Sequence, residues 1–164
     1  MNLIGNYKDW VDPRWVELVN QRPGKPRPDL GDLLNYFERE QYQLAQEAGY
    51  DFSKPLWTIY EKDDLEIDIQ PSWSQGKTSW WITKLMPGQY MPMHSDPFTH
   101  TSDVKRYWMP LMDYEPGHVF IYKGEMIKDY KLGDLYQFDY ATDLHGAANI
   151  SYSPRIMLQI SECL

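Results

Sequence analysis

The stretch from Thr78 to Ile160 decides the fold. It contains the segments TSWWITKLM (78–86), VKRYWMPLM (104–112), HVFIY (118–122), DLYQFDY (134–140) and RIMLQI (155–160). β-Branched and aromatic residues dominate these segments, and turn-forming pairs such as Pro87-Gly88 and Lys123-Gly124 separate them, as is typical of strands. The short gaps suit antiparallel neighbours, because a parallel crossover needs a dozen or more residues. The pattern therefore predicts a mainly β fold, either a jelly roll or a barrel.

Composition supports this prediction. The chain has 164 residues, a length that one hydrophobic core can serve, so a single domain over 1–164 is expected. Aromatic residues make up 15% of the chain, and only five residues are Ala, the best helix former. We expect residues 78–162 to form the β core and residues 1–77 to support it with helices and an edge strand.

The supporting region shows four local patterns. Asp12-Pro13 before RWVELVN predicts a short helix with an Asp cap and Pro at its first position. Three prolines and a glycine at 22–28 predict a loop. Apolar spacing over 29–49 predicts one long amphipathic helix, and the acidic run EKDDLEID at 61–68 predicts an edge strand.

Charge and hydropathy exclude several classes of protein. The net charge is -8, which would repel nucleic acid. Mean hydropathy is -0.65, and no stretch approaches the ~20 apolar residues of a membrane helix. The start MNLIGNYKDW does not resemble a secretory signal, so a cytoplasmic location is expected. Cys163, the one cysteine, excludes an internal disulfide and a Cys-based zinc site, and an inert thiol is expected there.

One set of residues has the chemistry of a metal centre. His94 and Asp96 stand two residues apart at the end of a strand-like run, so both side chains can reach one point. His145 follows 51 residues later in another strand-like segment. Two His and one carboxylate form the facial triad of non-haem Fe(II) oxygenases. Arg155 begins a strand of apolar residues, and a buried guanidinium needs an anion, which a small dicarboxylate would supply.

These residues resemble a known family. Together with Gly88, Gly133-Asp134, Phe138-Asp139 and Asn149, they resemble the double-stranded β-helix (a cupin-like jelly roll) of Fe(II)- and 2-oxoglutarate-dependent dioxygenases, and most closely the aspartyl/asparaginyl β-hydroxylase-like subgroup. The resemblance covers about residues 78–162. The animal β-hydroxylases lack the carboxylate ligand that Asp96 would provide here.

The resemblance implies a role for each matching residue. His94, Asp96 and His145 would hold the iron, and Arg155 would pair with the distal carboxylate of 2-oxoglutarate. Arg106 matches an arginine on the strand after the first metal ligand, which contacts 2-oxoglutarate. Thr83 matches, by its offset alone, a hydroxyl residue that supports the distal carboxylate.

The predicted function is hydroxylation of a C–H bond in a peptidyl residue or a small amine or amino acid, and the acidic N-terminal half could receive a basic peptide. Two alternatives stay open. The first is a cupin-type metalloprotein that works without 2-oxoglutarate, as an isomerase or a small-molecule binder, because Gly88 before His94 and His145-x3-Asn149 also fit the cupin pattern. The second is a metal-free interaction module. The sequence predicts neither the substrate nor the oligomeric state.

Strand parity makes further predictions about single side chains. Arg106 and Trp108 should share one face of their strand, with Tyr107 and Met109 on the other. Trp80 and Trp81 should point to opposite sides, one into the core and one toward the site. His100 and His118 lack matching neighbours, so we expect both to be solvated.

Overall fold

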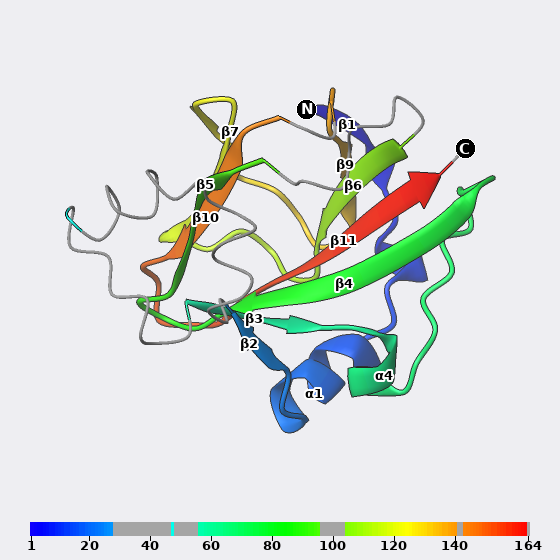
Figure 1. Ribbon diagram of the computed structural model, residues 1–164, viewed down its shortest axis with the longest axis horizontal. Helices are drawn as coiled ribbons and strands as arrows, with labels where there is room; N and C mark the ends of the chain where they lie inside the picture. Colours follow the sequence, from blue (N-terminus) through cyan, green and yellow to red (C-terminus); the bar gives the residue numbers. More distant parts are fainter. Residues whose placement is uncertain (28–46, 48–55, 96–103, 141–142, 164) are drawn as a thin grey trace.

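Two antiparallel sheets face each other (Figure 1). The structure is a computed structural model, and it describes residues 1–27, 47, 56–95, 104–140 and 143–163. Residue 47 excepted, the long helix predicted at 29–49 lies outside the described residues. No helix among the described residues is both long enough and apolar enough to cross a membrane.

The larger sheet, sheet A, has seven strands and sheet B has four. In spatial order, sheet A consists of β1 (Asn2–Asn6), β9 (Asp134–Gln137), β6 (Val104–Pro110), β11 (Arg155–Cys163), β4 (Lys77–Leu85), β3 (Trp57–Tyr60) and β2 (Lys25–Arg27). Sheet B consists of β5 (Tyr90–His94), β10 (His145–Asn149), β7 (His118–Tyr122) and β8 (Glu125–Met126).

The chain order of the strands identifies the topology. From β4 to β11, the strands β4, β11, β6 and β9 are neighbours in sheet A, and β5, β10, β7 and β8 are neighbours in sheet B. This is the strand order 1-8-3-6 facing 2-7-4-5 of a jelly roll, which is a double-stranded β-helix. The predicted mainly β fold is therefore confirmed.

Strand alternation separates two hydrophobic clusters. On β11, Ile156, Leu158 and Ile160 belong to an outer cluster on the far side of sheet A, whereas Met157 belongs to an inner cluster between the sheets. The parity predictions are confirmed, because Tyr107 and Met109 lie in the outer cluster while Trp108 lies in the inner one. Trp80 is also in the outer cluster, and Trp81 on the opposite face contacts Arg106.

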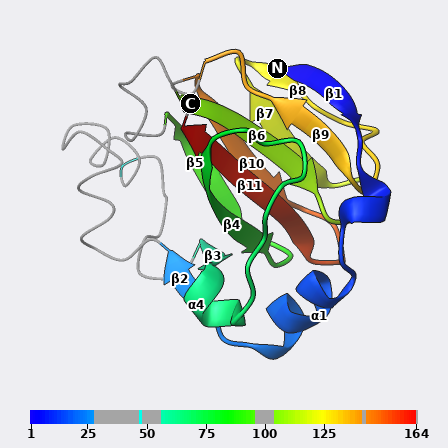
Figure 2. The same cartoon turned by 90° about the vertical axis from the view of Figure 1, so that its right-hand side faces the viewer.

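The N-terminal segment packs on sheet A from outside (Figure 2). It contains β1, the 3-10 helix η1 (Lys8–Trp10) and the helix α1 (Arg14–Gln21), and α4 (Lys62–Leu65) lies beside α1. The predicted short helix is present, but it begins one residue later than expected. Pro13 is the N-cap, and Asp12 accepts a hydrogen bond from the backbone N–H of Arg14 over 2.9 Å.

Two predictions for this region were wrong. The expected loop at 22–28 contains β2, because an edge strand tolerates Pro26, whose missing N–H can face away from β3. The expected edge strand at 61–68 contains the helix α4 instead. Glu61 and Asp64 form a capping box and Glu66 ends the helix at φ 54°, so local hydrogen bonds outweigh the alternating pattern.

Candidate metal centre

Two histidines face each other at one end of the space between the sheets. β5 and β10 pair so that His94 lies opposite His145, with 4.4 Å between the ring centroids. The register shifts next to this pair, where two residues of β5 oppose the single residue Gly146 of β10. A Cβ at Gly146 would come within 2.8 Å of the sulfur of Met93, so glycine permits the close approach of the strands. Such a bulge commonly aims a side chain at a functional site.

Backbone carbonyls select the tautomer of both rings. Nδ1 of His94 lies 2.7 Å from the carbonyl oxygen of Pro92, and Nδ1 of His145 lies 2.9 Å from that of Asp143. A carbonyl only accepts, so each Nδ1 donates its proton and each Nε2 keeps its lone pair for a metal. Burial lowers the pKa of His94 and lowers that of His145 well below its usual value, and the positive charge of Arg106 lowers both further. Both rings are therefore neutral at neutral pH, which is the form that binds a metal.

The third predicted ligand, Asp96, lies outside the described residues. Among the residues that are described, no group of three or more His, Cys, Asp or Glu side chains could hold a metal ion. The structure thus brings together two of the three predicted ligands, and the complete triad stays a prediction.

Arg106 lies buried close to this histidine pair. Its guanidinium carbon is 5.0 Å from the ring centroid of Trp81 and 5.3 Å from that of Phe138, whose ring in turn contacts His145 at 5.1 Å. Nη2 of Arg106 donates a hydrogen bond to Oε1 of Gln159 over 2.7 Å. Sequence reasoning missed Gln159, although a polar residue two positions after Met157 on the inward face of β11 was a usable signal.

Arg155 is buried beside the inner cluster, on the same face of β11 as Met157. Its guanidinium carbon lies 5.7 Å from the ring of Trp108 and 5.5 Å from the ring of Phe120. Nε and Nη2 have no hydrogen-bond partner, and no carboxylate in the described part of the chain forms an ion pair with it. Burial lowers the pKa of this guanidinium. The anion that its burial demands is thus not provided by the described protein residues.

Thr83 lies near Arg155 on the same inward face of sheet A. It pairs in register with Met157, and its neighbour two residues on, Leu85, pairs with Arg155. Thr83 is buried, and its hydroxyl donates a long hydrogen bond of 3.4 Å to the carbonyl of Met157. Its position is compatible with the predicted support of a carboxylate at Arg155.

Asn149 has a structural role in the His145-x3-Asn149 pattern. Its buried amide nitrogen donates to the carbonyls of Leu85 and Ser153, and its amide oxygen accepts from the backbone and hydroxyl of Ser151. These four bonds tie the end of β10 to the end of β4 and to the turn before β11. The residue holds the two sheets together instead of contributing a ligand.

The expectation that His118 is solvated was wrong. His118 is fully buried, because it is the first inward-facing residue of β7, a strand that lies between β10 and β8 in sheet B. Its alternation with Phe120 and Tyr122 was the signal that sequence reasoning passed over. His100, which was also expected to be solvated, lies outside the described residues.

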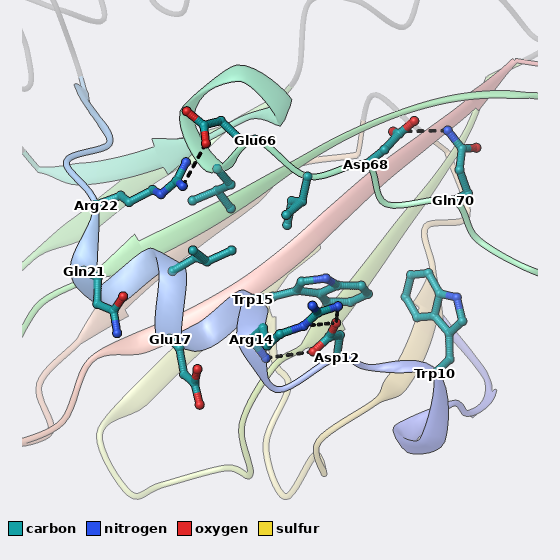
Figure 3. A pocket seen from close by; sticks show the side chains of 13 residues that line it. Trp10, Asp12, Arg14, Trp15, Glu17, Gln21, Arg22, Glu66, Asp68 and Gln70 are labelled. Atoms are coloured by element: carbon teal, nitrogen blue, oxygen red, sulfur yellow. Dashed lines mark hydrogen bonds and ion pairs between the residues drawn. The ribbon is translucent and has the colours of Figure 1, made fainter.

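A hollow of about 770 Å³ lies elsewhere, between α1 and the segment around α4 (Figure 3). Its lining mixes Trp10 and Trp15 with charged side chains such as Asp12, Arg14 and Glu66, several of which already form ion pairs. Trp15 belongs to the outer cluster, so the hollow is separated from the histidine pair by sheet A. It is not part of the candidate metal centre.

Comparisons with known proteins give a likeness in fold. No family model matches the chain, and no curated protein matches it. A predicted oxalate decarboxylase from Thermotoga maritima is 16% identical, with a TM-score of 0.44 over 66% of this chain and 81% of its own. A cupin domain of an XRE family transcriptional regulator from Enterobacter cloacae is 14% identical, with a TM-score of 0.46 over 66% of this chain and 98% of its own. KdgF from Halomonas sp. is 9% identical, with a TM-score of 0.45 over 79% of this chain and 92% of its own. At such identities, the likeness concerns the fold alone.

Proposed function

We propose that the protein is an Fe(II)- and 2-oxoglutarate-dependent dioxygenase that hydroxylates a C–H bond of a peptidyl residue or of a small amine or amino acid. The observation that carries this proposal is the buried guanidinium of Arg155, which has no carboxylate partner among the described residues. The ring of Phe120 lies between this guanidinium and the pair of neutral histidines. When bound, Fe(II) and 2-oxoglutarate together supply the activation of O2 that oxidises the substrate, and 2-oxoglutarate leaves as succinate and CO2.

The histidine pair fits such an ion. His94 and His145 present unprotonated nitrogens from adjacent strands, and carbonyl oxygens fix the orientation of both rings. Asp96, two residues after His94, would complete the facial triad that leaves three positions open. Burial between two sheets would keep bulk water away from the centre.

The two buried arginines fit the two carboxylates of the co-substrate. Arg106 lies near the histidines, so it would meet the carboxylate next to the metal, while Arg155 would hold the distal one. The ring of Phe120 lies 6.3 Å from the ring of His145 and 5.5 Å from the guanidinium carbon of Arg155, so it borders the path between the two ends.

A visible spectrum tests the proposal. Under anaerobic conditions, Fe(II) and 2-oxoglutarate should together give a weak charge-transfer band. His94→Ala should lose both the metal and the band. Arg155→Met should keep the metal but lose the band at 2-oxoglutarate concentrations that saturate the wild type. Arg14→Met, which removes an arginine with a 79% exposed side chain, is the matched control and should behave like the wild type.

The opposite results would favour the cupin-type alternative. A protein that binds Zn(II) or Mn(II) through His94 and His145, but whose spectrum and stability ignore 2-oxoglutarate, would be a metalloprotein without that co-substrate. If the band does form, succinate release measured over a panel of peptides and amino acids would identify the substrate class of the oxygenase.

A further inference from the structure

Five buried polar atoms without hydrogen-bond partners gather around Arg155. They are Nε and Nη2 of Arg155, the hydroxyl of Tyr130 and both ring nitrogens of His118. The three residues are 2%, 1% and 0% exposed, respectively. Native proteins leave few buried polar atoms unpaired, so several in one place indicate a polar occupant from outside the described chain.

The three side chains act on one another. The positive charge of Arg155 lowers the pKa of His118, after the larger effect of burial, and the hydroxyl of Tyr130 opposes the lowering of the Arg155 pKa by burial. Tyr130 approaches Arg155, and the carbonyl of Ser153 approaches His118, but neither contact has the geometry of a hydrogen bond. The hydrogen-bond donors of Arg155, Tyr130 and His118 therefore do not satisfy one another.

Packing prevents these side chains from turning away. The ring of Tyr130 lies edge-on against Trp108 at 5.2 Å and against Tyr114 at 5.3 Å. His118 lies in register opposite Asn149, whose four hydrogen bonds hold that end of the sheets together. Arg155 and Tyr130 both contact Trp108, and His118 shares the buried face of β7 with Phe120, the other ring against Arg155. The three side chains therefore occupy one region of the inner cluster.

The chemistry of the donors specifies the occupant. A guanidinium offers only donors and carries a full positive charge, a phenol can donate one proton, and a neutral imidazole donates from one nitrogen. A carboxylate accepts all of these bonds and matches the planar fork of the guanidinium, whereas a water molecule would leave the charge without a counter-ion.

We infer that His118 and Tyr130 join Arg155 in a three-residue carboxylate cradle that lets the protein select a dicarboxylic over a monocarboxylic 2-oxo acid. The identity of the occupant as the distal carboxylate of 2-oxoglutarate rests on the proposed function. Tyr130 and His118 are then binding residues for the co-substrate, although neither lies near the predicted metal ligands in sequence.

Isothermal titration of the Zn(II)-loaded protein tests the cradle without turnover. The two probes are 2-oxoglutarate and 2-oxobutyrate, which lacks the distal carboxylate. Tyr130→Phe and His118→Leu should each weaken 2-oxoglutarate binding by about tenfold or more, as loss of one hydrogen bond to a charged group implies, and should leave 2-oxobutyrate binding unchanged. Tyr114→Phe is the matched control, because this tyrosine packs on Tyr130 yet contributes none of the unpartnered atoms, and it should change neither affinity.

The outcomes separate the cradle from the proposed function. If the wild type binds 2-oxoglutarate and both variants bind it equally well, the cradle is overturned while the proposed function stands. A second outcome is that the wild type fails to bind 2-oxoglutarate while glutarate raises its melting temperature, and raises that of Tyr130→Phe by less. In that case the proposed function fails and the cradle stands. If glutarate has no effect either, both fail. Tyr130→Phe removes a single buried oxygen, and an unchanged near-ultraviolet circular dichroism spectrum would verify its fold.

Discussion

Replacing Arg155 with methionine should stabilise the ligand-free protein while abolishing its response to 2-oxoglutarate. The guanidinium is buried without a carboxylate partner among the described residues, and two of its nitrogens have no hydrogen bond. Exchanging buried charge for apolar side chains of similar volume typically stabilises a protein by about 1–4 kcal/mol. Methionine is long and flexible enough to fill the space that the arginine leaves.

The expected gain is reduced by the aromatic contacts of Arg155. Its guanidinium lies 5.7 Å from Trp108 and 5.5 Å from Phe120, and each such cation–π contact is worth about 0.5–1 kcal/mol. The net rise in the free energy of unfolding is therefore about 1 kcal/mol, which corresponds to a rise in melting temperature of about 2–4 °C for a chain of this size.

Urea unfolding of the metal-free protein, followed by tryptophan fluorescence, measures this difference. With 2-oxoglutarate at 100 times its Kd, the metal-loaded wild type should gain about 2.7 kcal/mol, and the variant should gain nothing. Arg106→Met is the informative contrast, because Arg106 donates to Gln159 and its loss should destabilise the protein by about 1–3 kcal/mol. A ligand-free Arg155→Met protein that unfolds at lower urea than the wild type, with an unchanged slope, would refute the reasoning.

Three further predictions concern stability, each measured by urea unfolding. Burial alone would raise the pKa of Glu162, but hydrogen bonds from two hydroxyls and two backbone N–H groups lower it from 4.5 to about 2. The ionised carboxylate therefore stabilises the folded protein fully above pH 4.5, and this stabilisation is lost as the pH falls toward 2. Glu162→Gln should cost about 2 kcal/mol at pH 7 and flatten the stability profile between pH 4.5 and 2; an unchanged acid limb would contradict this. Asn149→Ala should cost about 3 kcal/mol or more, because it leaves buried carbonyls without donors, and a cost below about 1 kcal/mol would show that its four bonds are dispensable. Gly117→Ala should destabilise more than Gly124→Ala, since both have positive φ but only at Gly117 would a Cβ meet backbone atoms, the nearest at 2.7 Å; equal losses would mean that φ alone decides.

Side-chain parity was the part of the fold that the sequence predicted best. Alternation along the strand correctly placed Arg106 and Trp108 on one face and Tyr107 and Met109 on the other. Successive side chains of a strand point to opposite faces even when both faces are buried. The spacing of His94 and His145 could not show that they pair in register, since that depends on which strands become neighbours in sheet B. The resemblance to Fe(II)- and 2-oxoglutarate-dependent dioxygenases implied only that both residues would hold one metal ion, not that their strands are neighbours.

Two of the three failures depend on the place of a strand in its sheet, and the third depends on local side-chain hydrogen bonds. His118 looked like a strand start beside a turn, but its burial follows from the central place of β7 in sheet B. Pro26 looked incompatible with pairing, but β2 is an edge strand with one neighbour. At 61–68 a capping box between Glu61 and Asp64 favours a helix over the strand that the apolar alternation predicts. A search for alternation alone does not detect such a capping box.

The place of β11 determines when the molecule can fold. Among the described strands this one comes last along the chain, yet it lies in the middle of sheet A with β4 on one side and β6 on the other. During synthesis, β4 and β6 therefore leave the ribosome as open edges that have no strand between them. Arrival of β11 closes the sheet and brings Arg155 into the interior in the same step. Arg155 therefore reaches its buried position only when the sheet is complete, and until then the unpaired edges of β4 and β6 are open to pairing with other chains.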